Sequence, residues 1–206
     1  MTKNFLLRFF SSLLLGPLVI FLIYLESIFF NLLLFAVIVV SLYETLKLKN
    51  NTIKILIVFL LFIFVISTFQ IYNFNNGRYI IIFILLLTWL SDIGGYIFGK
   101  LIGGKKIKLI SPNKTYSGFF GSFLLVQLFG FFLKNLNLNY IDETLLNFYF
   151  LLTCTSIVIL GDLVFSFFKR KCKIKDFSNF IPGHGGLLDR VDGLVFLTIF
   201  IYISKL

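Results

Sequence analysis

Long apolar runs, separated by short polar segments, cover most of the 206-residue chain. Several runs reach or approach the roughly 20 residues that a helix needs to cross the hydrocarbon core of a bilayer. Because the runs lack the alternation of apolar and polar residues typical of membrane strands, the pattern predicts helices. We therefore expect an all-α integral membrane protein, built as a bundle of about seven transmembrane helices. The expected spans are residues 9–25, 28–46, 55–72, 79–98, 118–133, 145–168 and 193–204. The last span is short, and a start several residues earlier, inside the preceding polar motif, stays open.

The composition agrees with a membrane protein and excludes an ordinary soluble domain. Hydrophobic residues make up 59% of the chain, and charged residues only 14%, where a soluble domain carries about 25%. The N-terminus has a basic start and an apolar run without a small-residue cleavage site, so we expect an uncleaved first helix. Two cysteines, Cys154 and Cys172, indicate no disulfide framework. With a single histidine they also make no convincing zinc site.

The net charge of +10 is unevenly distributed along the chain. Most of the 19 lysines and arginines lie before the first expected span and in alternate connections after it. The positive-inside rule then predicts a cytoplasmic N-terminus and an external C-terminus. The two long polar loops, 99–118 and 169–192, would both face the cytoplasm, where nucleotides are found. The positive charge is thus explained by topology, and we expect no nucleic-acid partner.

The fourth expected span ends with an acidic residue and spaced glycines. Asp92 lies within or at the edge of the hydrocarbon, where a carboxylate is costly and is commonly functional. The alternative is a carboxylate that bonds a neighbour or reaches interface water near the helix end. Gly95, Gly99 and Gly103 lie four residues apart, a spacing that lets another helix pack closely, within the chain or in a dimer.

The loop that follows offers hydroxyls and a cation. Ser111, Lys114 and Thr115 precede a helix that we expect to start near residue 117 or 118. Helix N-termini favour anions, so a phosphate is one candidate ligand. The alternative is a basic loop that rests on anionic lipid headgroups. The loop by itself leaves both interpretations open.

Charge is concentrated in residues 161–193, which hold four of the nine acidic residues and the single histidine. Carboxylates and waters are the ligands that Mg²⁺ prefers, commonly shared with substrate phosphates. Lysines and arginines neutralise phosphates, and glycine amides can face phosphate oxygens. The pattern predicts a phosphate-handling site with one or two Mg²⁺ ions at a membrane surface. Its members are Asp162, Asp176, Asp189 and Asp192, with Lys169, Arg170, Lys171, Lys173, Lys175, Arg190 and the Gly183-His184-Gly185-Gly186 turn.

Each of these residues also has a structural interpretation. Asp162 could pair with a lysine inside the bundle, and His184 could be a turn residue without a ligand. Lys169, Arg170 and Lys171 resemble the ordinary basic flank of a membrane helix. The combination favours a site because it also requires aspartates within apolar runs.

Residues 166–192 resemble the signature of the phosphatidate cytidylyltransferases (CDP-diglyceride synthases). The resemblance extends upstream and covers about the C-terminal half of the chain. The matching positions are Ser166, Lys169-Arg170, Lys175-Asp176, Pro182-Gly183-His184-Gly185-Gly186, Asp189-Arg190-Val191-Asp192, Gly161-Asp162-Leu163, Ser111-Pro112, Lys114-Thr115, Gly118, and Asp92 with Tyr96, Gly99, Gly103 and Lys105.

The resemblance implies an enzyme of phospholipid biosynthesis that converts CTP and phosphatidic acid into CDP-diacylglycerol and pyrophosphate. It implies an integral membrane homodimer that depends on Mg²⁺, with K⁺ as a second ion. We expect one catalytic domain, 1–206, with N-terminal helices in 1–75 and the CTP and phosphatidate site in 76–206. A bacterial inner membrane, with the active site on the cytoplasmic side, is the expected location.

The resemblance also implies roles for the residues. Asp162 and Asp189 would hold metal, and the bundle would bring them together. Asp176 and Asp192 would orient Lys175 and Arg190 or touch the metal. The expected catalytic residues are Asp162, Asp176, Asp189, Asp192, Lys175, Arg190 and His184, with Lys175 and Arg190 on phosphates. The expected substrate-binding residues are Lys169, Arg170, Asp92, Ser111, Lys114, Thr115, Ser166, Gly183, Gly185 and Gly186.

The sequence departs from the family pattern at several positions. Asn113 replaces a second lysine, Tyr116 a tryptophan, and Ser117 and Phe165 two glutamates. The chain is also shorter than common bacterial members, which we interpret as missing N-terminal helices. Two other functions stay open. One is a CTP-dependent kinase of a polyprenol or phytol. The other is a transporter whose Asp92 and Asp162 line a pore.

Overall fold

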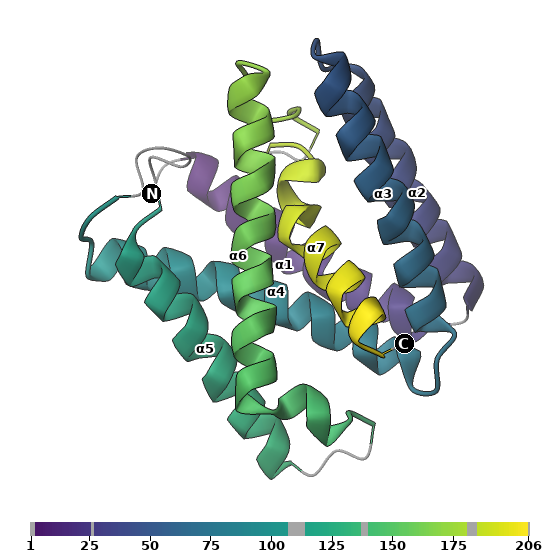
Figure 1. The fold of residues 1–206 in the computed structure, drawn as a ribbon, viewed down its shortest axis with the longest axis vertical. Coiled ribbons are helices and arrows are strands. Elements are labelled where there is room, and N and C mark those ends of the chain that lie inside the picture. Colours follow the sequence, from purple (N-terminus) through teal and green to yellow (C-terminus); the bar gives the residue numbers. More distant parts are fainter. Residues whose placement is uncertain (1–2, 26, 107–113, 137–139, 181–184, 206) are drawn as a thin grey trace. The chain divides into compact units, whose positions relative to one another are not determined.

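A computed structural model describes residues 3–25, 27–106, 114–136, 140–180 and 185–205, with side chains from residue 14 onward. The described part contains seven α-helices and one 3-10 helix (Figure 1). They are α1 (Lys3–Tyr24), α2 (Ser27–Leu46), α3 (Asn51–Tyr72), α4 (Gly77–Leu101), α5 (Tyr116–Asn135), η1 (Glu143–Leu146), α6 (Phe148–Lys171) and α7 (Leu188–Lys205).

The expected all-α membrane class is confirmed. One α-helix corresponds to each predicted span, although α6 begins at Phe148, three residues after the expected start at 145. Five of these helices, α2 to α6, are long and apolar enough to cross a membrane. Large apolar side chains on these helices point outward: Phe62 is 63% exposed and Phe131 is 68% exposed. Such surfaces suit lipid rather than water. The protein is a multi-pass membrane protein, and the side on which its loops lie stays a prediction.

The chain divides into two compact units. The first comprises Met1–Ile66 and Phe168–Val191, and the second comprises Ser67–Phe167 and Asp192–Leu206. Helices α6 and α7 each contribute residues to both units.

Close packing of α4 on α5 organises the second unit (Figure 1). A Cβ added at Gly94 would lie 2.4 Å from the carbonyl oxygen of Gly121, so only glycine fits between these backbones. A Cβ at Gly95 would meet Ser122 Oγ at 3.0 Å, and one at Gly99 would meet Thr115 Oγ1 at 3.0 Å. The predicted role of Gly95 and Gly99 in helix packing is confirmed, and their partner is a helix of the same chain.

The same prediction is wrong for Gly103. Helix α4 ends at Leu101, and Gly103 lies in the turn beyond it with φ +67°. A Cβ there would meet no atom of the described residues within 4 Å. Glycine is favoured after a helix end because it adopts positive φ without a steric penalty, so Gly103 serves the turn rather than a helix contact.

Glycines also bring α6 and α7 together within the second unit. A Cβ at Gly161 would lie 2.9 Å from the carbonyl oxygen of Asp192, and one at Gly193 would lie 2.9 Å from Val158 Cγ1. Helix α7 begins at Leu188, five residues before the expected start at 193. The polar first turn concealed this start, although Asp189 suits the positive end of the helix dipole there.

Candidate active site

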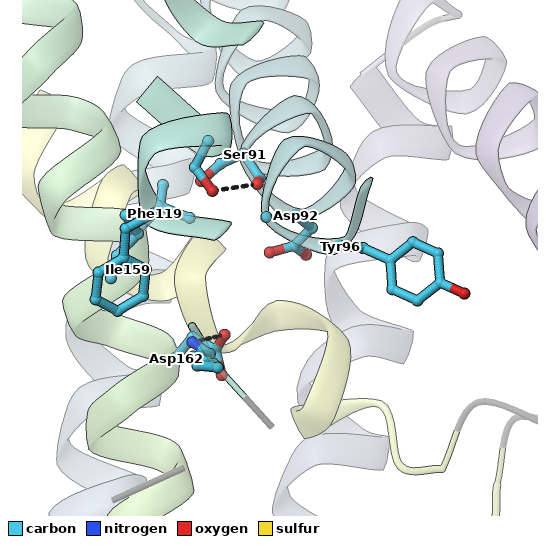
Figure 2. Close-up of a pocket in the computed structure, with 10 residues that line it drawn as sticks. Ser91, Asp92, Tyr96, Phe119, Ile159 and Asp162 are labelled. Carbon is cyan, nitrogen blue, oxygen red and sulfur yellow. Dashed lines mark hydrogen bonds and ion pairs between the residues drawn. The ribbon is translucent and has the colours of Figure 1, made fainter. Parts of the chain in front are cut away.

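Three predicted residues of the second unit lie around one cavity (Figure 2). Asp92 comes from α4, Asp162 from α6, and Lys114 from the segment before α5. Lys114 Nζ forms an ion pair with Asp162 Oδ2, and these side chains are 23% and 26% exposed. The lining consists of Ser91, Asp92, Gly95, Tyr96, Lys114, Phe119, Ser122, Val158, Ile159 and Asp162. The structure therefore unites Asp92 and Asp162, which lie 70 positions apart in the sequence.

The start of α5 fixes the position of Lys114. Thr115 is the N-cap of α5, and its hydroxyl accepts a hydrogen bond from Gly118 N at 3.1 Å. Its backbone pairs with Lys106 in an isolated β-bridge, and the Ser117 hydroxyl donates to the carbonyl of Gly103. Thr115 was expected to bind substrate. Its observed contacts are structural, since they satisfy an amide of the first helical turn.

The size of this cavity limits what it can hold. Its volume is about 120 Å³. Pockets that enclose a whole small-molecule ligand are typically ~300–1,000 Å³. The cavity is therefore suited to a hydrated cation or a phosphate group, with two carboxylates and one ammonium at its wall.

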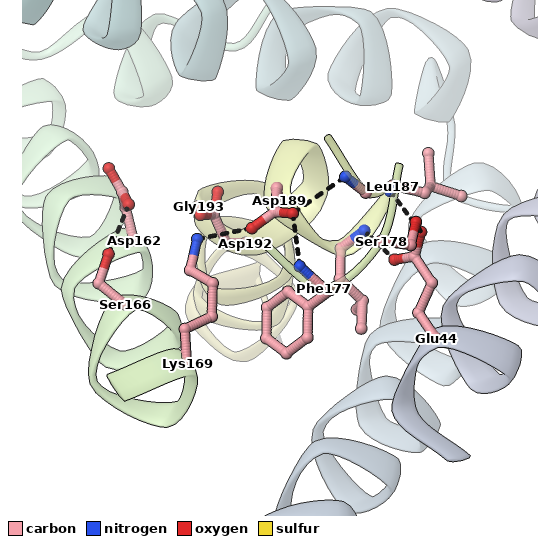
Figure 3. A network of polar contacts seen from close by, with 12 residues as sticks. Glu44, Asp162, Ser166, Lys169, Phe177, Ser178, Leu187, Asp189, Asp192 and Gly193 are labelled. Atoms are coloured by element: carbon pink, nitrogen blue, oxygen red, sulfur yellow. Dashed lines mark hydrogen bonds and ion pairs between the residues drawn. The ribbon is translucent and has the colours of Figure 1, made fainter. Parts of the chain in front are cut away.

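The second predicted metal ligand, Asp189, lies in the first unit (Figure 3). Its side chain is only 5% exposed. Oδ1 accepts from Lys169 Nζ at 2.6 Å, and Oδ2 accepts from the amides of Phe177 and Gly186, each at 3.0 Å. The ammonium of Lys169 also lies 5.6 Å from the centre of the Phe177 ring. These contacts tie the end of α6, the following loop and the start of α7 to one carboxylate.

Glu44 of α2 is a buried acidic residue that we did not predict in the site. It is 0% exposed and accepts hydrogen bonds from Ser178 Oγ, Leu187 N and Leu188 N (Figure 3). The sequence did contain a signal for it, because Glu44 lies near the end of the apolar run 28–46. A carboxylate in such a run is costly, the reason that also singled out Asp92.

Both predicted metal ligands fit a hard divalent cation. Among the described residues, no three His, Cys, Asp or Glu side chains gather in one place. Mg²⁺ does not require such a group, because it commonly binds one or two carboxylates and completes its shell with water and phosphate. Asp162 and Asp189 each already hold a positively charged ammonium. The pairing of Asp162 with a lysine is also the structural alternative that the sequence left open.

The other predicted residues have varied surroundings. Ser166 Oγ lies 3.5 Å from Asp162 Oδ1, at the limit of a hydrogen bond. Asp192 is buried and its Oδ1 accepts from Gly193 N. Gly185 has φ +91°. Arg170, Lys175, Asp176 and Arg190 are exposed.

Three predicted residues, Ser111, Gly183 and His184, lie outside the described residues. Asp162 belongs to the second unit and Asp189 to the first. Their predicted meeting therefore stays a prediction.

Comparison with known proteins agrees with the family resemblance of the sequence motifs. Phosphatidate cytidylyltransferase of Staphylococcus haemolyticus (strain JCSC1435) is 40% identical over 132 residues, which cover 60% of this chain and 47% of the relative. The proteins of the same name from Staphylococcus epidermidis (strain ATCC 12228 / FDA PCI 1200) and Staphylococcus aureus (strain COL) are each 41% identical over 128 residues, again 60% of this chain and 47% of the relative. The chain thus spans about half the length of the curated relatives it matches.

A family model confirms the family that the sequence motifs predicted. That model, described as the cytidylyltransferase family, matches residues 49–205. The match includes Asp92, Lys114, Asp162 and Asp189, and it covers most of the chain. This chain belongs to the cytidylyltransferase family.

Proposed function

We propose that this protein transfers CMP from CTP to phosphatidic acid and forms CDP-diacylglycerol and pyrophosphate. The observation that carries the proposal is the cavity at which Asp92, Lys114 and Asp162 meet, in a chain of this family. The Staphylococcus relatives are named phosphatidate cytidylyltransferase, and this name indicates the substrate class.

The reaction requires neutralisation of the negative charge on the two substrates, and it requires no nucleophile from the protein because the phosphate of phosphatidic acid attacks. A phosphate oxygen of phosphatidic acid bonds to the α-phosphorus of CTP, the bond from that phosphorus to the bridging oxygen breaks, and pyrophosphate leaves with the electron pair. Lys114 at the cavity and Lys169 beside Asp189 are suited to offset the negative charge on these groups. Exposed Arg170, Lys175 and Arg190 would add charge near the triphosphate.

Asp162 and Asp189 would hold Mg²⁺, with K⁺ as a second ion. Bound Mg²⁺ would supply a Lewis acid that polarises phosphate oxygens. The carboxylates themselves provide hard oxygen donors, and Asp189 is held in place by two backbone amides.

The surroundings of the cavity suit a lipid that enters from the side. On α4, Ile93 and Tyr96 are 48% and 64% exposed, and the ring of Tyr96 points away from Asp162 (Figure 2). Acyl chains would lie against this apolar surface while the phosphate reaches the polar cavity. We place the cavity and the N-terminus on the cytoplasmic side, from the positive-inside rule, and expect a homodimer.

The test is CMP transfer by the purified protein in detergent, with CTP labelled at the α- or γ-phosphate. We expect the α-label to be transferred to lipid, the γ-label to be released as pyrophosphate, and no CDP to form. Asp162→Asn should abolish this transfer. Asp142→Asn should not, because the Asp142 side chain is 60% exposed and forms an ion pair with Lys205, away from the cavity lining.

Two outcomes would contradict the proposal. Transfer of the γ-label to a polyprenol or phytol, with release of CDP, would indicate a lipid kinase. Solute flux across vesicles without nucleotide would indicate a transporter. Full CMP transfer by the Asp162→Asn variant would refute the role of Asp162 in holding metal.

A further inference from the structure

Glu44 makes three contacts with the segment that carries Asp189. Its Oε1 accepts from Ser178 Oγ at 2.5 Å and from Leu187 N at 2.8 Å, and its Oε2 accepts from Leu188 N at 2.8 Å (Figure 3). All four residues belong to the first unit. Glu44 lies in the last turn of α2, whereas Leu188 is the first residue of α7, so the contacts join elements 144 positions apart.

The chemistry of these contacts explains why an apolar helix retains a buried carboxylate. Burial of a charged group without partners is very costly. The first amides of a helix lack partners within the helix, and together they present a partial positive charge. The start of α7 stabilises the buried carboxylate of Glu44, and the same carboxylate accepts hydrogen bonds from two amides that would otherwise lack partners.

Two carboxylates divide the donors of one segment between them. Asp189 accepts from Phe177 N and Gly186 N, and Glu44 accepts from the residues immediately after each, Ser178 and Leu187. Both carboxylates also lie close to Gly186. A Cβ there would lie 2.9 Å from Glu44 Oε1 and 3.0 Å from Asp189 Oδ2. The position of the Asp189 carboxylate is therefore coupled to that of Glu44 through the backbone of residues 186–188.

We propose that Glu44 is a positioning residue that holds the start of α7 so that Asp189 faces a divalent cation with the correct orientation. The inference rests on the proposed function, in which Asp189 holds that cation. It adds a residue that lies before the family match at 49–205. The N-terminal helices would then support the site directly rather than serve only as a membrane anchor.

The test compares Glu44→Gln with a matched control, Glu143→Gln. Both substitutions replace a carboxylate by an amide of the same shape, but Glu143 is exposed in η1. The first readout is hydrogen exchange of the amides of residues 186–188. The second is Mn²⁺ binding to the purified protein, followed by electron paramagnetic resonance, with Asp189→Asn as the reference for a lost ligand. The third is the Mg²⁺ concentration that gives half-maximal CMP transfer.

We expect Glu44→Gln to speed exchange at these amides by about tenfold or more, because one acceptor oxygen of the carboxylate is replaced by a donor. Mn²⁺ affinity should fall by about tenfold, and the half-maximal Mg²⁺ concentration should rise by a similar factor. Glu143→Gln should leave all three readouts unchanged. A simple loss of folded protein would lower the maximal rate without shifting the metal concentration, so the metal readouts separate positioning from general destabilisation.

Ser178→Ala provides a milder variant in case Glu44→Gln does not fold. It removes one donor to Glu44 and leaves the two amide contacts, so it should shift the metal readouts in the same direction by a smaller factor. Unchanged exchange at residues 186–188, or faster exchange with unchanged Mn²⁺ affinity, would overturn the inference. If the wild-type protein transfers no CMP, the proposed function fails. The exchange and Mn²⁺ measurements would still decide the role of Glu44.

Discussion

Substitution of Gly186 by alanine tests how closely the two carboxylates enclose the start of α7. The added Cβ would lie 2.9 and 3.0 Å from the two Glu44 oxygens and 3.0 Å from Asp189 Oδ2. Ordinary contacts at such a carbon are 3.4–4 Å. At least one carboxylate must therefore retreat by several tenths of an ångström, although each is held by hydrogen bonds.

The cost follows from those hydrogen bonds. A retreat of about 0.5 Å would lengthen the contacts of Glu44 with Leu187 N and Leu188 N from 2.8 Å to about 3.3 Å, beyond the usual range. A hydrogen bond to a charged group contributes about 1.5–3 kcal/mol. Since two such bonds weaken without being lost, Gly186→Ala should lower the free energy of unfolding by about 2–3 kcal/mol.

The assay is denaturant unfolding of the detergent-solubilised protein, arranged as a double-mutant cycle with Glu44→Ala. Removal of the Glu44 carboxylate also removes two of the three close contacts, so Gly186→Ala should cost at least about 1 kcal/mol less in that background. Gly185→Ala is the control, since its main penalty is backbone strain at φ +91°. An equal cost of Gly186→Ala in both backgrounds, or a cost below about 0.5 kcal/mol, would refute the reasoning.

Other substitutions test the second unit. Gly121→Ala should cost about 3 kcal/mol or more in denaturant unfolding, because its Cβ would lie 2.4 Å from Phe98 Cβ. Gly103→Ala, at φ +67° and with no neighbour within 4 Å among the described residues, should cost only about 1–2 kcal/mol. Thr115→Ala should cost about 1 kcal/mol by the same measurement, from loss of the N-cap of α5. Lys114→Met should reduce CMP transfer by about tenfold or more, whereas Lys205→Met, at an exposed ion pair, should leave it unchanged.

The helices could be predicted from hydropathy because a membrane helix must be apolar over most of its length. The ends of the helices could not be predicted from hydropathy, because the helical hydrogen bonding continues into polar residues. Helix α6 extends to Lys171, three residues beyond the predicted span, and α7 begins with the charged turn around Asp189. In both cases the polar extension carries residues of the candidate site, Lys169 and Asp189.

The regular glycine spacing shows how one pattern can serve two purposes. Gly95 and Gly99 lie on a face of α4 that meets α5, but the helix ends before Gly103. A repeat of four residues predicts a common face only while the helix continues. The sequence did not mark that end, so the same spacing predicted a contact that does not exist within the described residues.

The cavity around Asp162 could be predicted in part. The motifs named Asp92, Lys114 and Asp162 individually, and the structure brings these three together within one unit. The role of Thr115 as a helix cap could also have been inferred, since threonine is favoured at that position. What sequence could not provide is the contact partner of each acid, because the pairs Lys114–Asp162 and Lys169–Asp189 join residues 48 and 20 positions apart.

Glu44 shows the opposite case, because an acidic residue inside an apolar run is a signal that the sequence itself contains. The resemblance began after the third span, so the N-terminal apolar runs were assigned only to the membrane. A buried acid in such a run has few ways to be stabilised, and the start of another helix is one of them. The ends of buried helices are therefore natural partners to seek for any acid inside an apolar span.

The contacts of the two predicted metal ligands determine which one gives the clearer test. Asp189 accepts from two backbone amides that shape the loop before α7, so Asp189→Asn would disturb structure and chemistry together. The contacts of Asp162 with Lys114 and Ser166 both come from side chains, and its carboxyl is 26% exposed at the cavity. The Asp162→Asn substitution, which removes the negative charge of this carboxylate, should therefore leave the fold largely intact. Loss of CMP transfer in a folded Asp162→Asn protein would consequently report on chemistry, whereas the same loss in Asp189→Asn becomes informative only beside the exchange data for residues 186–188.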